Sequence, residues 1–415
     1  MTTSSRSERA HHRSAGCNGP SSRRSDLRIV LALTAGPFVG IGLARFAYAL
    51  LLPAMRSELH WTFGIAGAVG TANGVGYLIG AAIAAPLAHK FGSRAVFVVA
   101  AGVSTVGLLG SALSDLLSVI MVLRFIVGIA GAACFVVGGG LTAEAGRRHD
   151  RRRATWLLAI YFAGCGFGIV ASGIAIPWVL TESSHAIGWR LGWLVLGVVA
   201  AACTAVSVRG VLQASEPTRK GTTHNRLPLR PISYLLVSYF LYGTGYISYM
   251  TFIVAFLNEQ GANATQIAAF WIVLGATSVA ATFAWGRLLA RSQHGRGSAT
   301  VLVFVSLGAV IPAISDSPLA MFGSAVLFGG SFLSVVTAVT AVARQTLPAI
   351  HWTSAIGALT IAFALGQCVG PALTGAIADS GAGVGVGLSV SAIILFVAAL
   401  TSLLHRDPVK VPRVE

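Results

Sequence analysis

Long apolar runs separated by short polar segments dominate the sequence. A helix needs roughly 20 consecutive apolar residues to cross a bilayer, and twelve runs are close to this length. The pattern therefore predicts an all-α integral membrane protein with twelve transmembrane helices. The expected spans are 29–52, 64–88, 95–113, 118–143, 154–180, 191–212, 232–257, 265–290, 298–314, 318–343, 353–378 and 383–404.

The basic residues lie mostly in alternate polar segments. If the N-terminus is on the inside, 25 of the 29 Lys and Arg residues fall in inner segments and tails, whereas the outer segments hold Arg56 and Arg190. Lys and Arg close to span ends stay in the cytoplasm, so we expect both termini to be cytoplasmic. This asymmetry also explains the net charge of +16 without a nucleic-acid partner.

Composition excludes several other classes of protein. A chain that is 55% hydrophobic and 10% charged has too few polar residues for a soluble surface. Its five cysteines are isolated in the sequence, so we expect neither a disulfide framework nor a zinc site. An intramembrane enzyme would need clustered His, Cys or acidic side chains, and the spans hold no such cluster. We therefore expect a protein without enzymatic activity, cofactor or metal.

Two pairs of matching segments indicate an internal repeat. Ala85–Arg94 follows the second span and matches Gly286–Arg291 after the eighth, at an offset of 201 residues. Gly164–Gly168 in the fifth span matches Gly366–Pro371 in the eleventh, at an offset of 202. The agreement predicts two pseudo-symmetric six-helix bundles. The expected parts are a disordered basic tail 1–27, a bundle 28–212, a cytoplasmic linker 213–231, a bundle 232–404 and a tail 405–415.

The repeated segments resemble the major facilitator superfamily of secondary transporters, and the resemblance extends from Leu27 to Leu404. Ala85–Arg94 is similar to the family signature G-x-L-a-D-r-x-G-r-r, but it has Ala85 for the glycine and His89 for the acid. It retains Leu87, Lys90, Gly92 and Arg94. The fourth span resembles the family motif R-x-x-x-G-x-G through Arg124, Gly128, Ala130 and Gly131.

The stretch Gly40–Met55 looks like an uncharacterised bacterial branch often labelled arabinose-efflux-permease-like, a label that implies little about substrate. The resemblance implies a monomeric transporter that moves a small organic solute through the bilayer of the bacterial inner membrane by alternating access. It also implies that the first and fourth spans line a central cavity.

Arg45 and Arg124 are the charged residues that lie deep in predicted spans. Arg45 is eleven residues from Arg56 at the outer end of its span, and Arg124 is nine from Asp115, so both are about 15 Å deep. Charges in spans are costly and usually functional. With no acid beside them, the two arginines favour an anionic substrate. For Arg124, a structural role with hydrogen bonds to backbone carbonyls remains open.

Polar aromatic residues are the other candidates for the substrate site. Tyr239, Tyr242, Tyr246 and Tyr249 are spaced three, four and three residues apart, which places them on one helical face. Their hydroxyls are candidates for substrate hydrogen bonds, with interhelical packing as the alternative. The remaining candidates are Tyr48, Asn73, Tyr77, Tyr161, Trp271 and Gln367.

The polar segment after the second span is a candidate gate. Glu144 ends the fourth span beside the segment that holds His89, Lys90, Gly92 and Arg94. We expect Glu144 to form an ion pair with this segment in the outward-open state, and His89 to make that pair sensitive to pH.

Two functions remain in competition. The first is secondary transport of a small organic anion, with co- or counter-transport of a proton left open. The alternative is a proton-driven exporter of drugs or sugars. The fifth-span glycines suggest it, because they resemble the antiporter motif G-x-x-x-G-P-x-x-x-G of the family, although they lack its proline. A membrane-embedded acid that carries the proton would favour the exporter, and the sequence shows none.

Overall fold

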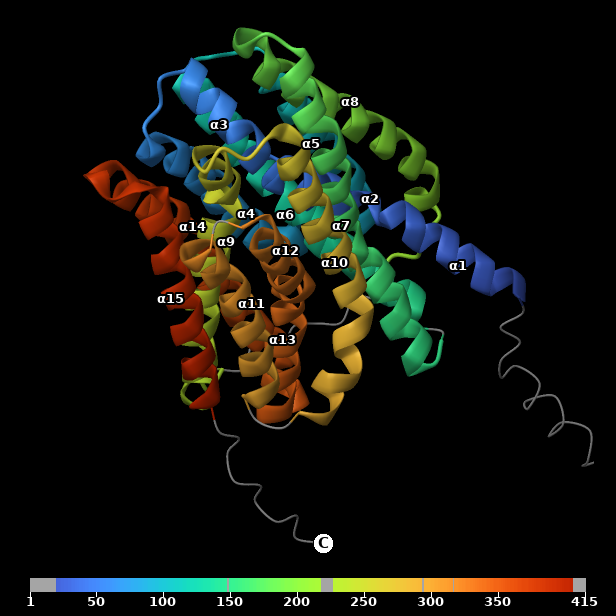
Figure 1. The fold of residues 1–415 in the computed structure, drawn as a ribbon. Coiled ribbons are helices and arrows are strands. Elements are labelled where there is room, and N and C mark those ends of the chain that lie inside the picture. Colours follow the sequence, from blue (N-terminus) through green and yellow to red (C-terminus); the bar gives the residue numbers. More distant parts are fainter. Residues whose placement is uncertain (1–19, 148, 218–226, 293–294, 316, 406–415) are drawn as a thin grey trace, which may run out of the picture.

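The computed structural model describes residues 20–147, 149–217, 227–292, 295–315 and 317–405, and every regular element in them is helical (Figure 1). Most of the predicted tails and part of the predicted linker, residues 1–19, 218–226 and 406–415, lie outside the described residues.

The first bundle contains six spans. The first span is composite, with α1 (Pro20–Leu33), α2 (Ala35–Pro37), the π-helical segment η1 (Phe38–Phe46) and α3 (Tyr48–Glu58) following one another. Single helices form the other five: α4 (Phe63–Phe91), α5 (Ser93–Gly110), α6 (Leu117–Gly146), α7 (Arg151–Glu182) and α8 (His185–Leu212).

The second bundle repeats this arrangement after a short turn, η2 (Arg230–Ile232). Its spans are α9 (Ser233–Glu259), α10 (Ala264–Arg291), α11 (Arg296–Ile314), α12 (Pro318–Phe332) with α13 (Ser334–Thr346), α14 (Trp352–Ile377) and α15 (Gly383–Leu403). The turn η3 (Ala349–His351) precedes α14.

The turn between α14 and α15 decides the number of spans. By length and hydropathy, eleven helical stretches of the described chain could cross a membrane, and the last, Ser354–Leu403, has 50 residues. The segment η4 (Ala378–Ala382) interrupts it, because Gly381 and Gly383 have φ angles of 89° and 80°, which favour glycine. The stretch therefore forms two spans. The twelve predicted transmembrane helices are confirmed.

One segment differs from its prediction. His89–Phe91, which follow the predicted second span 64–88, belong to the last turn of α4. The chain leaves the helix at Gly92, where φ is +87°. Apolar and alanine residues continue the helix to that glycine, and Pro86 is accommodated inside it.

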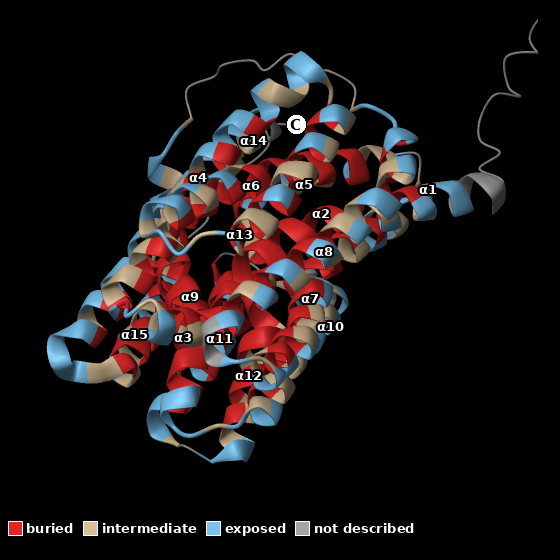
Figure 2. Cartoon of the chain, turned by 90° about the horizontal axis from the view of Figure 1, so that it is seen from above, coloured by how far each residue is buried: buried red, intermediate tan, exposed pale blue. Residues whose placement is uncertain are grey.

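The outer surface of the bundle is apolar. Large side chains such as Val106, Ile174, Trp178, Val206 and Ile393 are exposed on it, whereas the buried residues gather between the helices (Figure 2). Exposed apolar surface on this scale fits a lipid environment. The chain is a multi-pass membrane protein.

The two bundles meet along helix pairs that exchange under the internal pseudo-symmetry. The helix α4 packs on α14, α7 packs on α10, and α3 packs on α9. Glycines bring the backbones together: Gly67 lies against the carbonyl of Pro371, and Gly166 lies against that of Gly275. The helix α1 begins and α15 ends toward the same side of the molecule, the termini face (Figure 1).

Candidate functional site

The centre of the interface holds Arg45. The π-helical turns of η1 carry it. Such turns are rare in proteins, and those that occur are often found at functional sites. Its side chain is 7% exposed. One guanidinium nitrogen, Nη2, donates to Oε1 of Gln367 at 2.8 Å, and Nε2 of Gln367 donates to the hydroxyl of Tyr246 at 2.5 Å. Arg45 of the first bundle is thus tied to α14 and α9 of the second.

Tyr77 completes this group, the central cluster of Arg45, Tyr77, Tyr246 and Gln367. The Tyr77 ring centre is 4.6 Å from the guanidinium carbon of Arg45, a cation–π contact. Within the described part of the chain, Nε of Arg45 has no hydrogen-bond acceptor, and Arg45 forms no salt bridge. The buried cation therefore faces neutral groups.

Arg124 is enclosed within the first bundle. It is 2% exposed, and its Nη1 donates to the carbonyl oxygen of Ala44. Its guanidinium carbon lies 5.0 Å from the ring centre of Tyr48 and 5.3 Å from that of Trp193. These contacts correspond to the structural alternative for this arginine. Because Ala44 precedes Arg45, this hydrogen bond also holds the backbone of η1 next to Arg45.

The other predicted site residues hold helices together in this conformation. Tyr48, Tyr161 and Tyr242 donate to backbone carbonyls of Ala66, Phe135 and Phe332, and Asn73 donates to that of Arg124. Tyr249 shares a hydrogen bond with Ser324, and Trp271 donates to Ser172 across the bundle interface. The structure therefore does not bring these six side chains into the central cluster.

The tyrosine face of α9 forms a stack of rings. Tyr239, Tyr242 and Tyr246 all lie nearly parallel to Phe363 of α14, with ring centres 4.7 to 5.6 Å apart. The predicted common face is therefore present, and it packs against α14. Of these tyrosines, the structure places Tyr246 in the central cluster.

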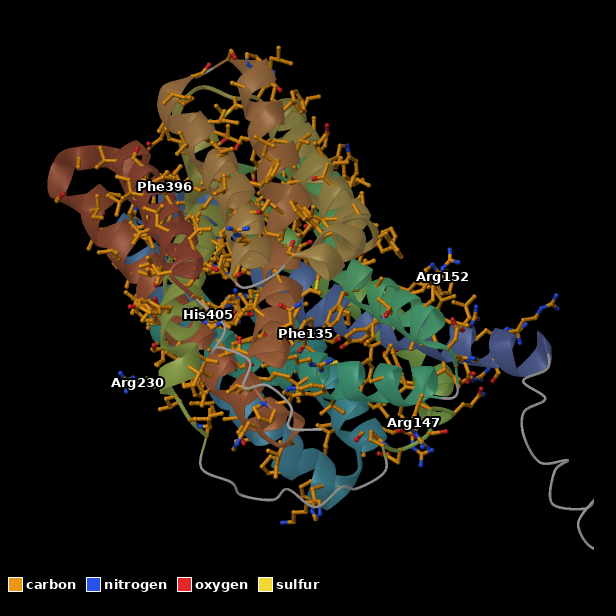
Figure 3. All side chains as sticks on the ribbon, turned by 90° about the horizontal axis from the view of Figure 1, so that it is seen from below. Phe135, Arg147, Arg152, Arg230, Phe396 and His405 are labelled. Carbon is orange, nitrogen blue, oxygen red and sulfur yellow. The ribbon has the colours of Figure 1, made fainter. Side chains whose placement is uncertain are left out.

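A pocket of about 210 Å³ opens between the bundles toward the termini face. It lies among α6, α7, α10 and α13, and its lining has aromatic, aliphatic and hydroxyl side chains without a charged residue. Its lining residues include Phe135, Thr155, Phe162, Cys165, Thr282, Trp285, Ser334 and Thr337. In a view of the termini face, Phe135 lies near the middle and Arg147, Arg152 and Arg230 lie around it (Figure 3).

The inner end of this pocket approaches the central cluster. Cys165 of α7 is one of its lining residues. Gly42, three residues before Arg45, lies against the carbonyl of Cys165. Cys165 therefore places the inner end of the pocket beside η1, the segment that carries Arg45.

The face opposite the termini is closed above Arg45. A second pocket of about 310 Å³ lies there at the ends of α3, α7, α9 and α10, with Leu50 and Val254 among its lining residues. Between this pocket and Arg45, residues such as Tyr48 of α3 and Tyr249 and Phe252 of α9 are buried. The described side chains separate this pocket from the central cluster.

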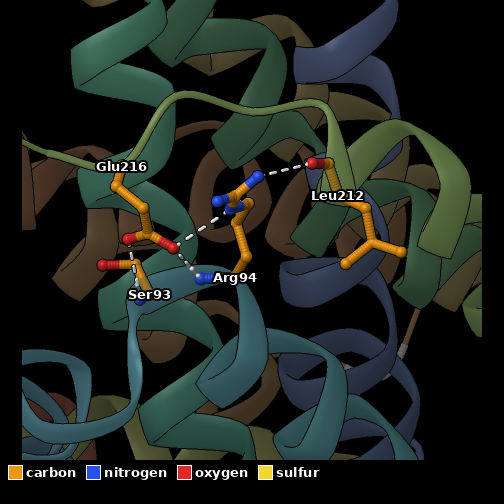
Figure 4. Close-up of polar contacts among 4 residues, drawn as sticks. All are labelled: Ser93, Arg94, Leu212 and Glu216. Atoms are coloured by element: carbon orange, nitrogen blue, oxygen red, sulfur yellow. Dashed lines mark hydrogen bonds and ion pairs between the residues drawn. The ribbon is translucent and has the colours of Figure 1, made fainter.

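The predicted gate residues lie at the termini face, and in this conformation the acid bonded to Arg94 is Glu216. Its carboxylate accepts hydrogen bonds from the backbone amides of Ser93 and Arg94 at 2.8 and 3.0 Å, and from Nε of Arg94 at 3.1 Å (Figure 4). Arg94 also donates to the carbonyl of Leu212. His89, Lys90 and Gly92 line the same surface pocket as Glu216. Sequence reasoning missed Glu216 because its partners are more than 100 residues away.

Glu144 was predicted to pair with the His89–Arg94 segment in the outward-open state. In the present conformation it pairs with Arg147. It accepts from Nε of Arg147 at 2.8 Å, one turn along the chain. For Glu216, partial burial works to raise the pKa, but the hydrogen bonds from Arg94 and Ser93 outweigh it and lower the pKa below its usual value. The hydrogen bonds of Glu144 and Glu216 join residues of the first bundle and of the linker that follows it.

Comparison with known proteins finds relatives described as transporters. The chain is 24% identical over 378 residues to the inner membrane transport protein YdhP of Escherichia coli K12, covering 89% of this chain and 94% of YdhP. It is 25% identical over 177 residues to the MFS-type transporter hepF of Aspergillus oryzae, covering 40% of this chain and 35% of hepF.

Solved structures share the fold. A point mutant of the nucleoside transporter NupG superposes with a TM-score of 0.70 at 14% identity, over 90% of this chain and 99% of NupG. A bacterial homolog of the human lysosomal transporter Spinster, in an inward-facing and occupied conformation, gives 0.70 at 16% identity, over 91% and 96%.

The family model described as "Uncharacterised MFS-type transporter YbfB" matches residues 37–403, from the end of α2 in the first span to the end of α15, and this range includes the central cluster. Twelve spans in two pseudo-symmetric bundles, a polar cluster at their interface and this match lead to one conclusion: the chain belongs to that family of the major facilitator superfamily and functions in transmembrane transport.

Proposed function

We propose that the protein is a secondary active transporter of a small organic anion, and that Arg45 binds the anionic group. The observation that carries this proposal is the buried guanidinium of Arg45, which has a neutral amide oxygen as its partner in place of a carboxylate. A cation without a counter-charge is costly in a membrane interior. A substrate carboxylate that replaced the Gln367 oxygen would form a stronger, charge-assisted bond.

The pocket below Arg45 suggests the shape of the anion. Its lining holds Phe135, Phe162 and Trp285 together with hydroxyls, and no second cation. Arg124, the other buried cation, is enclosed by Ala44 and by two aromatic rings, and it does not line the pocket. One available guanidinium above an apolar pocket favours a monocarboxylate with an apolar or aromatic body over a dianion or a sugar.

The positive-inside pattern supports a cytoplasmic termini face in the bacterial inner membrane. In that orientation the pocket beside η1 opens toward the cytoplasm and the outer ends of the bundles are in contact, which is the arrangement of an inward-open state. Transport then requires the two bundles to rock about the central cluster, so that the outer contacts between α4 and α14 open while the cytoplasmic pocket closes.

Ligand stabilisation of the purified protein tests the substrate class. Benzoate and benzamide have the same ring and nearly the same shape, but only benzoate is anionic at pH 7. We expect benzoate to raise the melting temperature and benzamide to leave it unchanged, because stabilisation grows with ligand concentration over Kd. If glucose or a lipophilic cation such as tetraphenylphosphonium stabilises the protein and carboxylates do not, the exporter alternative replaces the anion transporter.

A phosphatase fusion series tests the orientation. The reporter is active only where disulfides form, outside the cytoplasm. We expect activity after Glu182 and Glu259 and no activity after Arg153 and Thr222. An active fusion at Thr222 would contradict cytoplasmic termini, and the expression level of each fusion serves as the control.

A further inference from the structure

The first turn of α4 is bonded to an acid from the other bundle. Asp379 lies in η4, between α14 and α15. Its Oδ1 accepts from the backbone amide of Phe63 at 2.8 Å, and its Oδ2 accepts from that of Gly64 at 2.7 Å. These amides belong to the first helical turn, where N–H groups lack partners within the helix and the helix dipole favours negative charge.

The carboxylate of Asp379 can approach these amides because residue 64 is a glycine. A Cβ on Gly64 would lie 2.7 Å from Oδ2 of Asp379, so a side chain at this position would displace the acid. One helical turn further along α4, Gly67 lies against the carbonyl of Pro371, and Gly375 of α14 lies against that of Phe63. The Asp379 bonds therefore form at the end of a continuous backbone contact between the two bundles, on the face opposite the termini.

We infer that Asp379 is an ionised latch that holds this face closed, and that a proton bound to its carboxyl group releases the latch. This inference rests on the proposed alternating access, because the bonds must break when α4 and α14 separate. A protonated carboxyl group has lost its charge and accepts hydrogen bonds from the two amides less strongly.

Few other charged groups face this carboxylate. Arg56 of α3 interacts with it electrostatically. The helices α4, α14 and α15, which pack against η4, carry no Asp, Glu, Lys or Arg at this end, and His60 lies in the connection before α4. Partial burial works to raise the pKa of Asp379, but the bonds from Thr62, Gly64 and Phe63 and the charge of Arg56 outweigh it and lower the pKa below its usual value.

The sign of the pH dependence follows from this lowered pKa. When the face opens and the bonds are lost, the pKa returns toward its usual value, so the open state binds a proton more readily than the closed state. The latch therefore contributes fully to closure above the ordinary carboxyl pKa, and its contribution is lost as pH falls through the lowered value. Acid outside the membrane favours opening.

Spin-label distances across the closed face test the latch without any substrate. In a variant without the five native cysteines, labels at Leu113→Cys and Leu319→Cys report on the two bundles, since both side chains are at least 80% exposed at this face. At pH 7.5 we expect a short distance between the two labels when Asp379 is present. Asp379→Asn should raise the population with a long distance at least tenfold. Gly64→Ala retains the acid, but its methyl group occupies the space of the carboxylate, so this variant should give the same shift.

The matched control is Glu259→Gln, which removes an exposed acid at the same face and should leave the distances unchanged. Lowering the pH from 7.5 to 4 should raise the open population about twofold with Asp379 present and not at all in Asp379→Asn. Unchanged distances in both Asp379→Asn and Gly64→Ala would overturn the latch. Because no ligand is added, a failed search for an anionic substrate would leave this result intact.

Discussion

Substitution of Arg45 by lysine is expected to weaken the binding of an anionic substrate at least tenfold, while the protein still inserts in the membrane and remains monodisperse. Tenfold corresponds to about 1.4 kcal/mol. Lysine keeps the charge, but it lacks the planar group that lies over Tyr77 and can donate to Gln367 and a carboxylate together. The measurement is the Kd of benzoate, or of a tighter carboxylate from the same ligand series, by calorimetry.

Gln367→Glu tests the same site from the opposite side. It places a carboxylate of nearly the same size 2.8 Å from the guanidinium, where the amide oxygen now lies. We expect this internal counter-charge to occupy Arg45 and abolish binding of external anions, while the melting temperature of the free protein stays the same or rises. Conservative change at Ser306, whose hydroxyl bonds to a backbone carbonyl away from the cluster, is the control.

Two results would contradict the anion site. The first is an unchanged Kd in both Arg45→Lys and Gln367→Glu. The second is a preference of the wild-type protein for neutral or cationic ligands. Arg124→Lys distinguishes a binding role from a packing role. The guanidinium of Arg124 is enclosed by Tyr48, Trp193 and Ala44. We therefore expect this variant to have a lower melting temperature even without ligand.

The spans and the two bundles could be predicted from the sequence because both leave a pattern along the chain that does not depend on how the helices dock. A run of apolar residues reflects the lipid environment directly, and offsets of 201 and 202 residues reflect the duplicated bundles. The break between α14 and α15 was also predicted, as the gap between the spans 353–378 and 383–404, and the structure adds that Gly381 and Gly383 have positive φ there.

The partners of the candidate site residues could not be predicted in the same way. Arg45 and Gln367 were both candidates, yet their hydrogen bond joins residues 322 apart and depends on how the bundles dock. Tyr242 and Tyr246 share one face of α9, but one hydroxyl meets a carbonyl of the tenth span and the other meets Gln367. Periodicity predicts a face, whereas the direction of each hydroxyl depends on the neighbouring helix.

Asp379 was missed for a related reason. An acid between two apolar runs is usual in a solvated connection, and its spacing from neighbouring residues gives no signal. Its partners are backbone amides of Phe63 and Gly64, which carry no side-chain feature in the sequence that marks them as donors. Only the docking of α14 on α4 shows that the first turn of one helix receives the acid of another bundle.

The glycine contacts between α4 and α14 lead to the second large effect, a loss of transport on Gly67→Leu. A Cβ at this position would overlap the carbonyl oxygen of Pro371 in the conformation described here. Overpacking of this kind costs roughly 1 to 3 kcal/mol, which shifts a two-state equilibrium by up to about a hundredfold. Transport in proteoliposomes should fall below about a tenth of the wild-type rate.

The same clash is absent when the outer ends of the bundles separate, so Gly67→Leu should fold and favour the outward-open state, which the Leu113 and Leu319 labels report as a long distance. Gly128 provides the contrast: a Cβ there would overlap the carbonyl oxygen of Asn73, inside the first bundle, so Gly128→Leu should lower the melting temperature in every conformation. Gly102, where a Cβ would meet no described atom within 4 Å, should tolerate leucine. If Gly67→Leu keeps both the short distance and the wild-type transport rate, contact between α4 and α14 is not required for the cycle.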